Sequence, residues 1–269
     1  MSHLRNLLFL SIFLPFSTVS NAQSISMKDM EKDLIKVYNK IFPFYYGDPD
    51  SLEYYSSLFT TKITNYIKDN PSTLDYPFQS LIDSNCCWIT TSKDGSFRIY
   101  SWDMLTGGTM HFFNSIYQWK SNGKVFIYTP TFGEDGFPST GFYTEIFTLH
   151  ANNKTYYLTI NNGSESSTVA YQGIDIISLE NGSFNDTIQL IKTKEGFTNS
   201  ILLECDINKY NGSERPVKLI KYDENKKIIY IPIIFEDGTV TDRYILYQFT
   251  GEYFEHILTQ KSPSDKPNN

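Results

Sequence analysis

A paired-hairpin pattern that recurs three times is the feature that most constrains the fold of this chain. Each copy begins with a strand, a polar turn and an aromatic or β-branched strand, at 89–102, 148–160 and 220–233. A second hairpin follows each copy, at 115–128, 174–188 and 244–257. Apolar side chains alternate along these segments and Asn-Gly or Asp-Gly occupies several turns, which is typical of antiparallel hairpins.

The pattern predicts a mostly β fold in which a short helical N-terminal region precedes three four-stranded antiparallel meander units. The units lie near 86–130, 143–191 and 217–258, and about 45 residues is the size expected of a propeller blade. We therefore expect a propeller-like array. A β-sandwich is the alternative, because three blades are too few for a closed propeller. Residues 200–206 form an additional strand between the second and third units, where it can close an edge.

The first 22 residues have the features of a secretory signal peptide. Arg5 precedes a short apolar run from Leu7 to Phe16, and Ser20 and Ala22 are the small residues of a cleavage site. The sequence therefore predicts an exported protein that is periplasmic or extracellular. No later apolar run is long enough to cross a bilayer, so we expect no membrane span in the mature chain.

The remaining chain divides into three predicted segments. Residues 23–85 form a helical N-terminal region, in which Ser26 caps one helix and Asp50 caps a second. Residues 86–259 form the antiparallel β domain with its three internal repeats. Residues 260–269 are rich in Pro, Ser, Asp and Asn and form a disordered tail.

Composition excludes several classes of function. The net charge of −7 argues against a nucleic-acid partner, which requires a basic surface. The histidines lack metal-ligand spacing and no nucleotide-binding motif is present, so we expect neither a metal nor a cofactor. The three cysteines, Cys86, Cys87 and Cys205, are interpreted as buried strand residues, although an exported protein could form one disulfide among them.

The candidate binding site lies at the end of the units that carries the long loops. In an up-down unit, the loop between strands two and three and the link to the next unit lie opposite the two short turns. Long irregular loops on a rigid sheet are common sites of function. The ligand-binding candidates in these loops are Asp103, Thr106, Gly107, Gly108, His111, Glu134, Ser166, Glu236 and Asp237.

Asp103 and His111 admit two interpretations. They are an acid–base pair across a Gly-rich turn, or they are an ordinary strand-end acceptor and a strand histidine with one bonded nitrogen. We favour the second, because spacing alone cannot show the geometry that catalysis requires. No catalytic residue is assigned.

Two segments resemble exported, uncharacterised proteins of Gram-negative bacteria. They are "SKDGSFRIYSWDMLTGGTMHFFNSIYQWK" at 92–120 and "VTDRYILYQFTGEYF" at 240–254. The resemblance implies an exported bacterial protein of mostly β structure, and it brings no activity, cofactor or catalytic residue.

The sequence favours a non-enzymatic binding protein that uses the long-loop end of its repeated β domain. Its partner is unknown, and a glycan, a peptide and an envelope protein all remain open. The first alternative is a carboxylate-dependent hydrolase of envelope or extracellular polymers, for which two loop carboxylates would suffice. The second alternative is a structural surface component.

Overall fold

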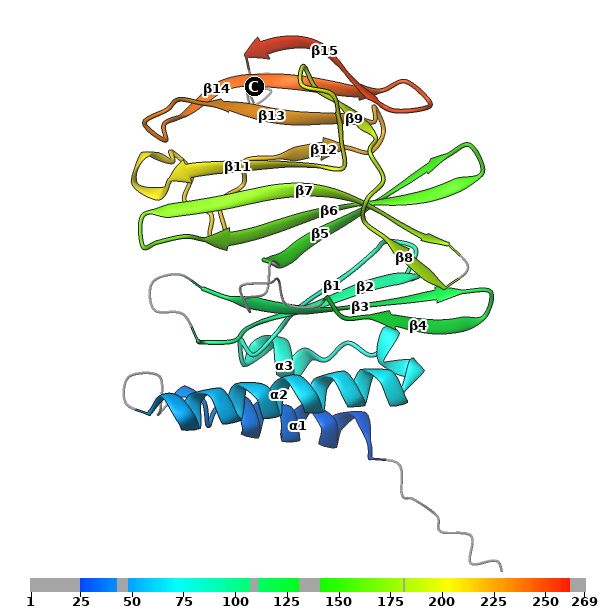
Figure 1. The fold of residues 1–269 in the computed structure, drawn as a ribbon, viewed down its shortest axis with the longest axis vertical. Helices are drawn as coiled ribbons and strands as arrows, with labels where there is room; N and C mark the ends of the chain where they lie inside the picture. Colours follow the sequence, from blue (N-terminus) through cyan, green and yellow to red (C-terminus); the bar gives the residue numbers. More distant parts are fainter. Residues whose placement is uncertain (1–24, 43–47, 107–110, 131–140, 181, 262–269) are drawn as a thin grey trace, which may run out of the picture.

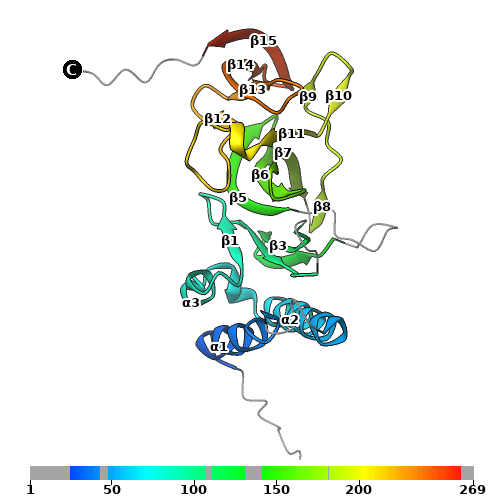
Figure 2. The same ribbon diagram turned by 90° about the vertical axis from the view of Figure 1, so that its left-hand side faces the viewer.

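The computed structural model describes residues 25–42, 48–106, 111–130, 141–180 and 182–261. The chain is mostly β, with a few helices at its N-terminal end and several antiparallel sheets, as predicted. Helices and sheets form four stacked layers along the long axis of the molecule (Figures 1 and 2). From bottom to top in Figure 1 these are the helices and three sheets, here named A, B and C.

The helical layer consists of three helices and a short 3-10 turn: α1 (Met27–Tyr38), α2 (Pro49–Asp69), η2 (Pro71–Leu74) and α3 (Gln79–Asp83). The predicted cap at Ser26 is confirmed, since its side chain accepts a hydrogen bond from the Asp29 amide at 3.1 Å. The predicted cap at Asp50 is wrong by two positions. Asp48 caps α2 instead, because Pro49 begins the helix and Asp48 accepts from the Ser51 amide.

Sheet A contains the first predicted unit in full. Its strands pair in chain order: β1 (Trp88–Thr91), β2 (Phe97–Asp103), β3 (Phe113–Ser121) and β4 (Lys124–Tyr128). Every residue of β2 is buried. Helices cover one face of the sheet through Tyr100 and Trp102, and sheet B covers the other through Phe97 and Ile99. The two-residue alternation predicted for this strand is therefore confirmed.

Sheet B differs from the second predicted unit at its last strand. It contains β5 (Phe142–Ala151), β6 (Lys154–Ser164), β7 (Val169–Glu180) and β11 (Ser200–Asp206), and the short β8 (Ser183–Asn185) also pairs with β7. β8 ends early because it turns toward sheet A, where Phe184 stacks on Tyr128 at 4.3 Å between ring centroids. The edge beside β7 is filled mainly by β11, the additional strand expected at 200–206.

Sheet C contains the third unit and two short additional strands. β12 (Lys221–Asp223), β13 (Ile228–Ile234), β14 (Val240–Phe249) and β15 (Phe254–Lys261) pair in chain order. β9 (Ile191–Lys192) pairs in parallel with the start of β15, and β10 (Phe197–Thr198) pairs with β9. The 3-10 turn η3 (Ile207–Lys209) follows β11.

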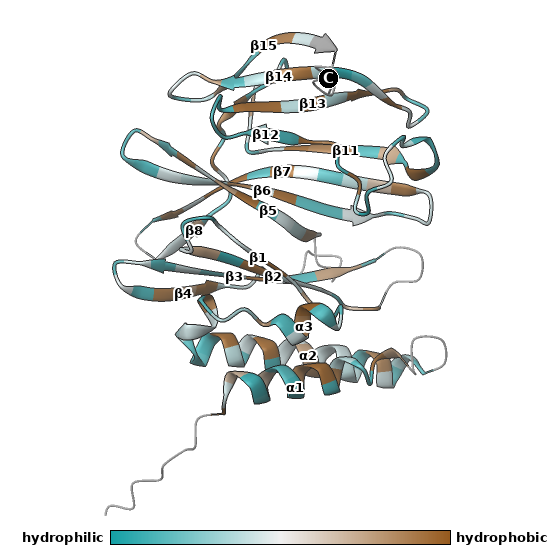
Figure 3. Ribbon diagram, turned by 180° about the vertical axis from the view of Figure 1, so that it is seen from behind, coloured by the Kyte–Doolittle hydropathy of each residue, from teal (hydrophilic) through white to brown (hydrophobic). Residues whose placement is uncertain are grey.

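Three hydrophobic cores lie between the four layers, one at each interface. The turns at the two ends of the sheets are mostly hydrophilic (Figure 3). The β6–β7 and β13–β14 loops lie at one end, on the left in Figure 1, and β2 also ends there. The link from the second to the third unit, at 192–198, was predicted at this same end. It lies at the opposite end, because β9 pairs with Phe254 just after the short turn between β14 and β15.

Candidate functional site

A cleft of about 420 Å³ lies between sheets A and B. Tyr117 of β3 and Tyr128 of β4 line it from sheet A, while Tyr143 of β5 and residues of β6 and β7 line it from sheet B. The segment from β8 to the start of β11 completes the lining with Phe184, Asp186, Asn199 and Leu202. The volume is in the range of pockets that bind small molecules.

The alternation of β7 places polar groups in this cleft. Ile174 and Ile176 face sheet C and are fully buried in the core between sheets B and C. Asp175 and Ile177 lie on the opposite face, toward sheet A. Ile177 packs with Phe97 and Tyr157 in the core between sheets A and B, whereas Asp175 lines the cleft beside that core. One face of a single strand therefore contributes to both the core and the cleft.

Asp175 is a half-buried carboxylate with an unusual proton affinity. Burial raises its pKa to about 6, the Asn161 side chain that donates a hydrogen bond to it lowers the pKa, and the negative charge of Asp186 raises it. Gly173 leaves room for this arrangement, because a Cβ there would lie 2.7 Å from the Asn161 side-chain oxygen. A carboxyl with this pKa changes charge close to neutral pH.

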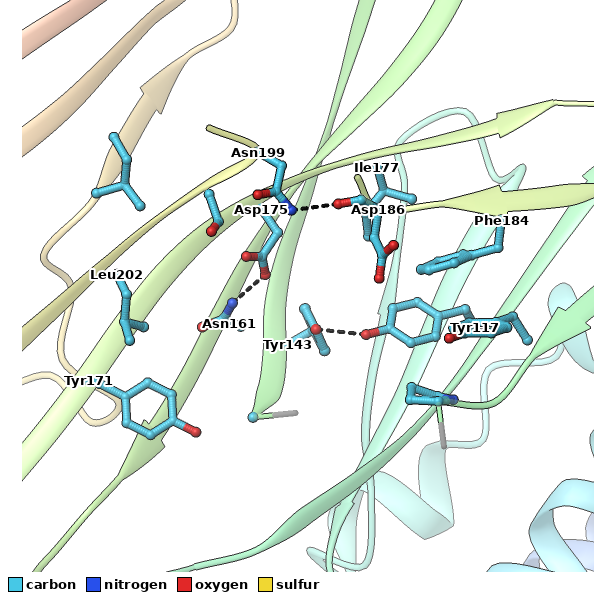
Figure 4. A pocket seen from close by; sticks show the side chains of 15 residues that line it. Tyr117, Tyr143, Asn161, Tyr171, Asp175, Ile177, Phe184, Asp186, Asn199 and Leu202 are labelled. Atoms are coloured by element: carbon cyan, nitrogen blue, oxygen red, sulfur yellow. Dashed lines mark hydrogen bonds between the residues drawn. The ribbon is translucent and has the colours of Figure 1, made fainter. Parts of the chain in front are cut away.

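Asp186 lies near Asp175 on the same side of the cleft (Figure 4). It follows β8 and is exposed. Its backbone carbonyl accepts a hydrogen bond from the Asn199 side chain at 2.5 Å, and the Asn199 carbonyl accepts one from the Ile176 amide at 2.9 Å. These two bonds attach the irregular segment after β8 to the centre of sheet B and hold Asp186 at the mouth of the cleft.

Aromatic side chains form the remaining walls. The hydroxyl groups of Tyr117 and Tyr143 are 2.7 Å apart, and burial raises the pKa of both phenols. Phe184 packs against the rings of Tyr117 and Tyr128 at centroid distances of 4.7 and 4.3 Å. Both phenols stay protonated at neutral pH, so they offer hydrogen bonds and aromatic surface and no charge.

Asp103 and His111 form a hydrogen-bonded pair at the end of sheet A. The Asp103 carboxylate lies 2.6 Å from His111 Nδ1 and also accepts from the Leu105 amide at 2.8 Å. The Tyr38 hydroxyl donates to the Asp103 backbone carbonyl at 3.2 Å. The His111 side chain is 41% exposed. The geometry required of an acid–base pair is present, but no nucleophile is hydrogen-bonded to the ring among the described residues.

Three other predicted residues gather around a second, more open groove. Glu236 and Asp237 line it together with β11, and its volume is about 580 Å³. Ser166 lies beside it and bonds to the Val169 amide at 3.1 Å. The Asp237 carboxylate already has two hydrogen-bond donors. It accepts from the Thr239 amide of its own loop at 3.0 Å and from the Lys209 side chain at 3.2 Å.

The predicted site residues therefore form two groups rather than one site. Asp103 and His111 lie on sheet A, and Ser166, Glu236 and Asp237 lie where sheets B and C meet. Thr106 is exposed in the loop after β2. Gly107, Gly108 and Glu134 lie outside the described residues. None of the predicted residues that the structure describes lines the cleft between sheets A and B.

Sequence reasoning missed this cleft, although one signal for it was visible. Asp175 stands between Ile174 and Ile176 in the run IDII, and a charge at such a position requires an explanation. Asn161, which donates a hydrogen bond to it, lies on β6, and Asp186 lies in the irregular segment after β8. Their meeting depends on how β8 turns toward sheet A, which the alternation of apolar residues does not predict.

Comparisons with known protein families and with curated proteins assign no function to this chain. No protein-family model matches the sequence, and no curated protein matches it significantly.

Across the described ranges, no helix is both long and apolar enough to cross a membrane. No group of three or more His, Cys, Asp or Glu side chains in the same ranges is arranged to hold a metal ion. The three cysteines are free and buried, but only Cys205 lies on a strand as predicted, because Cys86 and Cys87 precede β1.

Proposed function

We propose that the protein is a non-enzymatic binding protein that takes a small polar organic molecule into the cleft between sheets A and B. The observation that carries this proposal is the lining of the cleft, where two carboxylates, two carboxamides and four tyrosine phenols surround one partly open volume. A few polar groups placed among aromatic and aliphatic walls are typical of ligand sites.

The test is a thermal-shift screen of the protein against sugars, amines, amino acids and divalent cations. A ligand that binds only the folded state raises the melting temperature by mass action. We expect the shift to disappear in Tyr128→Ala, which removes an exposed wall of the cleft. It should persist in His111→Ala and Glu236→Gln. A shift that persists in Tyr128→Ala and disappears in His111→Ala or Glu236→Gln would place the ligand at the long-loop end. No shift with any compound would argue against a small-molecule site.

A carboxylate-dependent hydrolase is the second candidate, favoured by one specific observation. Asp175 has a pKa raised to about 6 and lies near a second carboxylate, Asp186. A protonated carboxyl beside an ionised one is the pairing that glycoside hydrolysis uses. Hydrolysis of envelope polysaccharides that increases below pH 6 and is abolished by Asp175→Asn, but not by Asp237→Asn, would support this function over simple binding.

We also propose that the protein is exported, with the first 22 residues as its leader. The support is the order of Arg5, the apolar run and the small residues at Ser20 and Ala22. Expression of the full chain in a bacterium, followed by fractionation and N-terminal sequencing, should yield a processed periplasmic or extracellular form that begins near Gln23. An unprocessed cytoplasmic product would contradict the proposal.

For the β region we propose a propeller-like array that remains open. Support comes from the face-to-face stacking of sheets A, B and C in chain order (Figure 1). In such an array, a ligand site between two neighbouring units is formed by equivalent strands of both. Tyr117 and Asp175 fit this expectation. Both line the cleft, and they lie on β3 and β7, the third strands of the first and second units.

A further inference from the structure

The cleft between sheets A and B contains two carboxylates and no basic side chain among the residues described for it. Asp175 and Asp186 line it, and no described Lys, Arg or His does. Neither carboxylate forms an ion pair within the described ranges. The internal segments 43–47, 107–110, 131–140 and 181 contain no Lys, Arg or His, so they cannot supply a cation either.

The negative charge of Asp175 changes the pKa of the side chains around it. Its one hydrogen-bond donor in the described ranges is the neutral Asn161. Burial raises the pKa of the Tyr117 and Tyr143 phenols, and the charge of Asp175 raises both further. A carboxylate removed from water is costly unless a positive charge or a proton compensates it. The site therefore has a negative potential that the described side chains leave uncompensated.

Aromatic rings around this charge favour an organic cation over a metal ion. Tyr117, Tyr128, Tyr143, Tyr171 and Phe184 all line the cleft. The faces of such rings attract ammonium groups, and recognition of quaternary ammonium compounds uses aromatic walls in this way. Calcium instead requires six or more oxygen ligands, of which carboxylates supply most. Only two carboxylates lie here among the described residues.

We propose that the ligand of this cleft is a small organic cation, an alkylammonium or quaternary ammonium compound, with Asp175 as its counter-ion and the tyrosine and phenylalanine rings as its walls. This inference rests on the proposed binding function and names the class of molecule that is bound. Asp186 at the mouth adds a second negative charge that attracts the cation as it enters.

The experiment compares molecules of equal shape and different charge. Calorimetric titrations at pH 7.5 and low salt use choline and its neutral isostere 3,3-dimethylbutan-1-ol, with tetramethylammonium and putrescine as further cations. We expect at least one cation to bind, and the isostere to bind about ten-fold more weakly than choline if choline is that cation. Asp175→Asn should weaken cation binding about ten-fold or more, while Asp237→Asn, a matched change at the long-loop end, should leave it unchanged.

Each other outcome overturns the inference in an identifiable way. Equal affinity for choline and the isostere, or full affinity in Asp175→Asn, would show that charge does not determine binding. Binding of calcium that excludes the amines would make this a metal site. If a neutral sugar binds in the cleft and no cation does, the proposed function stands and the inference fails. If no compound of either kind binds, both fail.

Discussion

Asp175 combines a predicted cost in stability with a position in the proposed binding site. It occupies a strand position whose neighbours in the same layer, such as Ile177 and Tyr157, are buried apolar side chains. Burial raises its pKa to about 6, whereas an aspartate in water has a pKa of 3.8. The phenols that face it from β3 and β5 stay protonated, and Asp186 is the other carboxylate that contributes to the shift.

The raised pKa predicts a definite pH dependence of stability. Between pH 4 and pH 6 the folded state holds a proton on Asp175 that the unfolded state has released, so the free energy of unfolding falls as the pH rises through this window. Asp175→Asn cannot ionise and keeps an acceptor for Asn161. We expect it to match the wild type near pH 4 and to exceed it above pH 7 by about 2 kcal/mol, a value reduced for partial solvent screening.

Urea unfolding at pH 4, 6 and 8 measures this difference. Asp237→Asn is the control with the opposite sign. Hydrogen bonds from Thr239 and Lys209 lower the Asp237 pKa, so its contribution to stability is present at neutral pH and is lost as the pH falls through the folded-state pKa. If Asp175→Asn were less stable than the wild type at pH 8, a positive charge or further hydrogen bonds would have to compensate the buried carboxylate, and the predicted cost of its ionisation would be wrong.

At the scale of elements, Gln172 of β7 attaches an irregular segment to sheet B. Its side-chain oxygen accepts from the Leu219 and Ile220 amides at 2.8 and 2.7 Å, and its nitrogen donates to the Val217 carbonyl at 2.7 Å. Gln172 is 3% exposed. The segment before β12 has no strand partner of its own at these residues, so one buried side chain satisfies several backbone groups.

Gln172→Leu should therefore be strongly destabilising. It keeps the approximate volume but leaves two buried amides and a carbonyl without partners, which costs on the order of 3 kcal/mol or more. Chemical denaturation measures the loss, and hydrogen exchange should show faster exchange at the Leu219 and Ile220 amides. Gln79→Leu, on the exposed surface of α3, is the matched control and should change stability by less than about 0.5 kcal/mol. Unchanged exchange at both amides would refute the assigned role of Gln172.

Local patterns predicted the elements much better than the contacts between them. The alternation of Phe97 and Ile99 with Tyr100 and Trp102 follows from the pleat of a strand, and the structure confirms it. The turn of β8 toward sheet A could not be predicted in this way, because it depends on Phe184 meeting Tyr128 from another sheet. The cleft depends on that meeting and was missed for the same reason.

At the scale of the whole molecule, each sheet is covered by the layer before it in the chain. The first layer is helical, and its contacts with sheet A are both apolar and polar. Phe59 of α2 packs on Trp102 at 5.7 Å between ring centroids. Arg98, which is 7% exposed, donates to the Thr73 and Tyr76 carbonyls at 2.8 and 2.5 Å. The helical layer therefore supplies hydrogen-bond acceptors to the buried Arg98 guanidinium, and it also covers an apolar face of sheet A.

A chain that starts at Cys86 should for this reason fail to fold as an independent β domain. Without 23–85, the apolar face of sheet A that includes Tyr100, Trp102 and Ile116 would be exposed. Exposed apolar faces of this kind lead to aggregation or to partial unfolding. We expect residues 86–261 to bind a hydrophobic dye and to lack the cooperative thermal transition of 23–261. Addition of 23–85 as a separate peptide should partly restore the transition, because the missing surface is complementary to it. If the shorter chain were to unfold cooperatively at the temperature of the longer one, the helices would cover sheet A without stabilising it, and residues 86–259 would be a domain on their own.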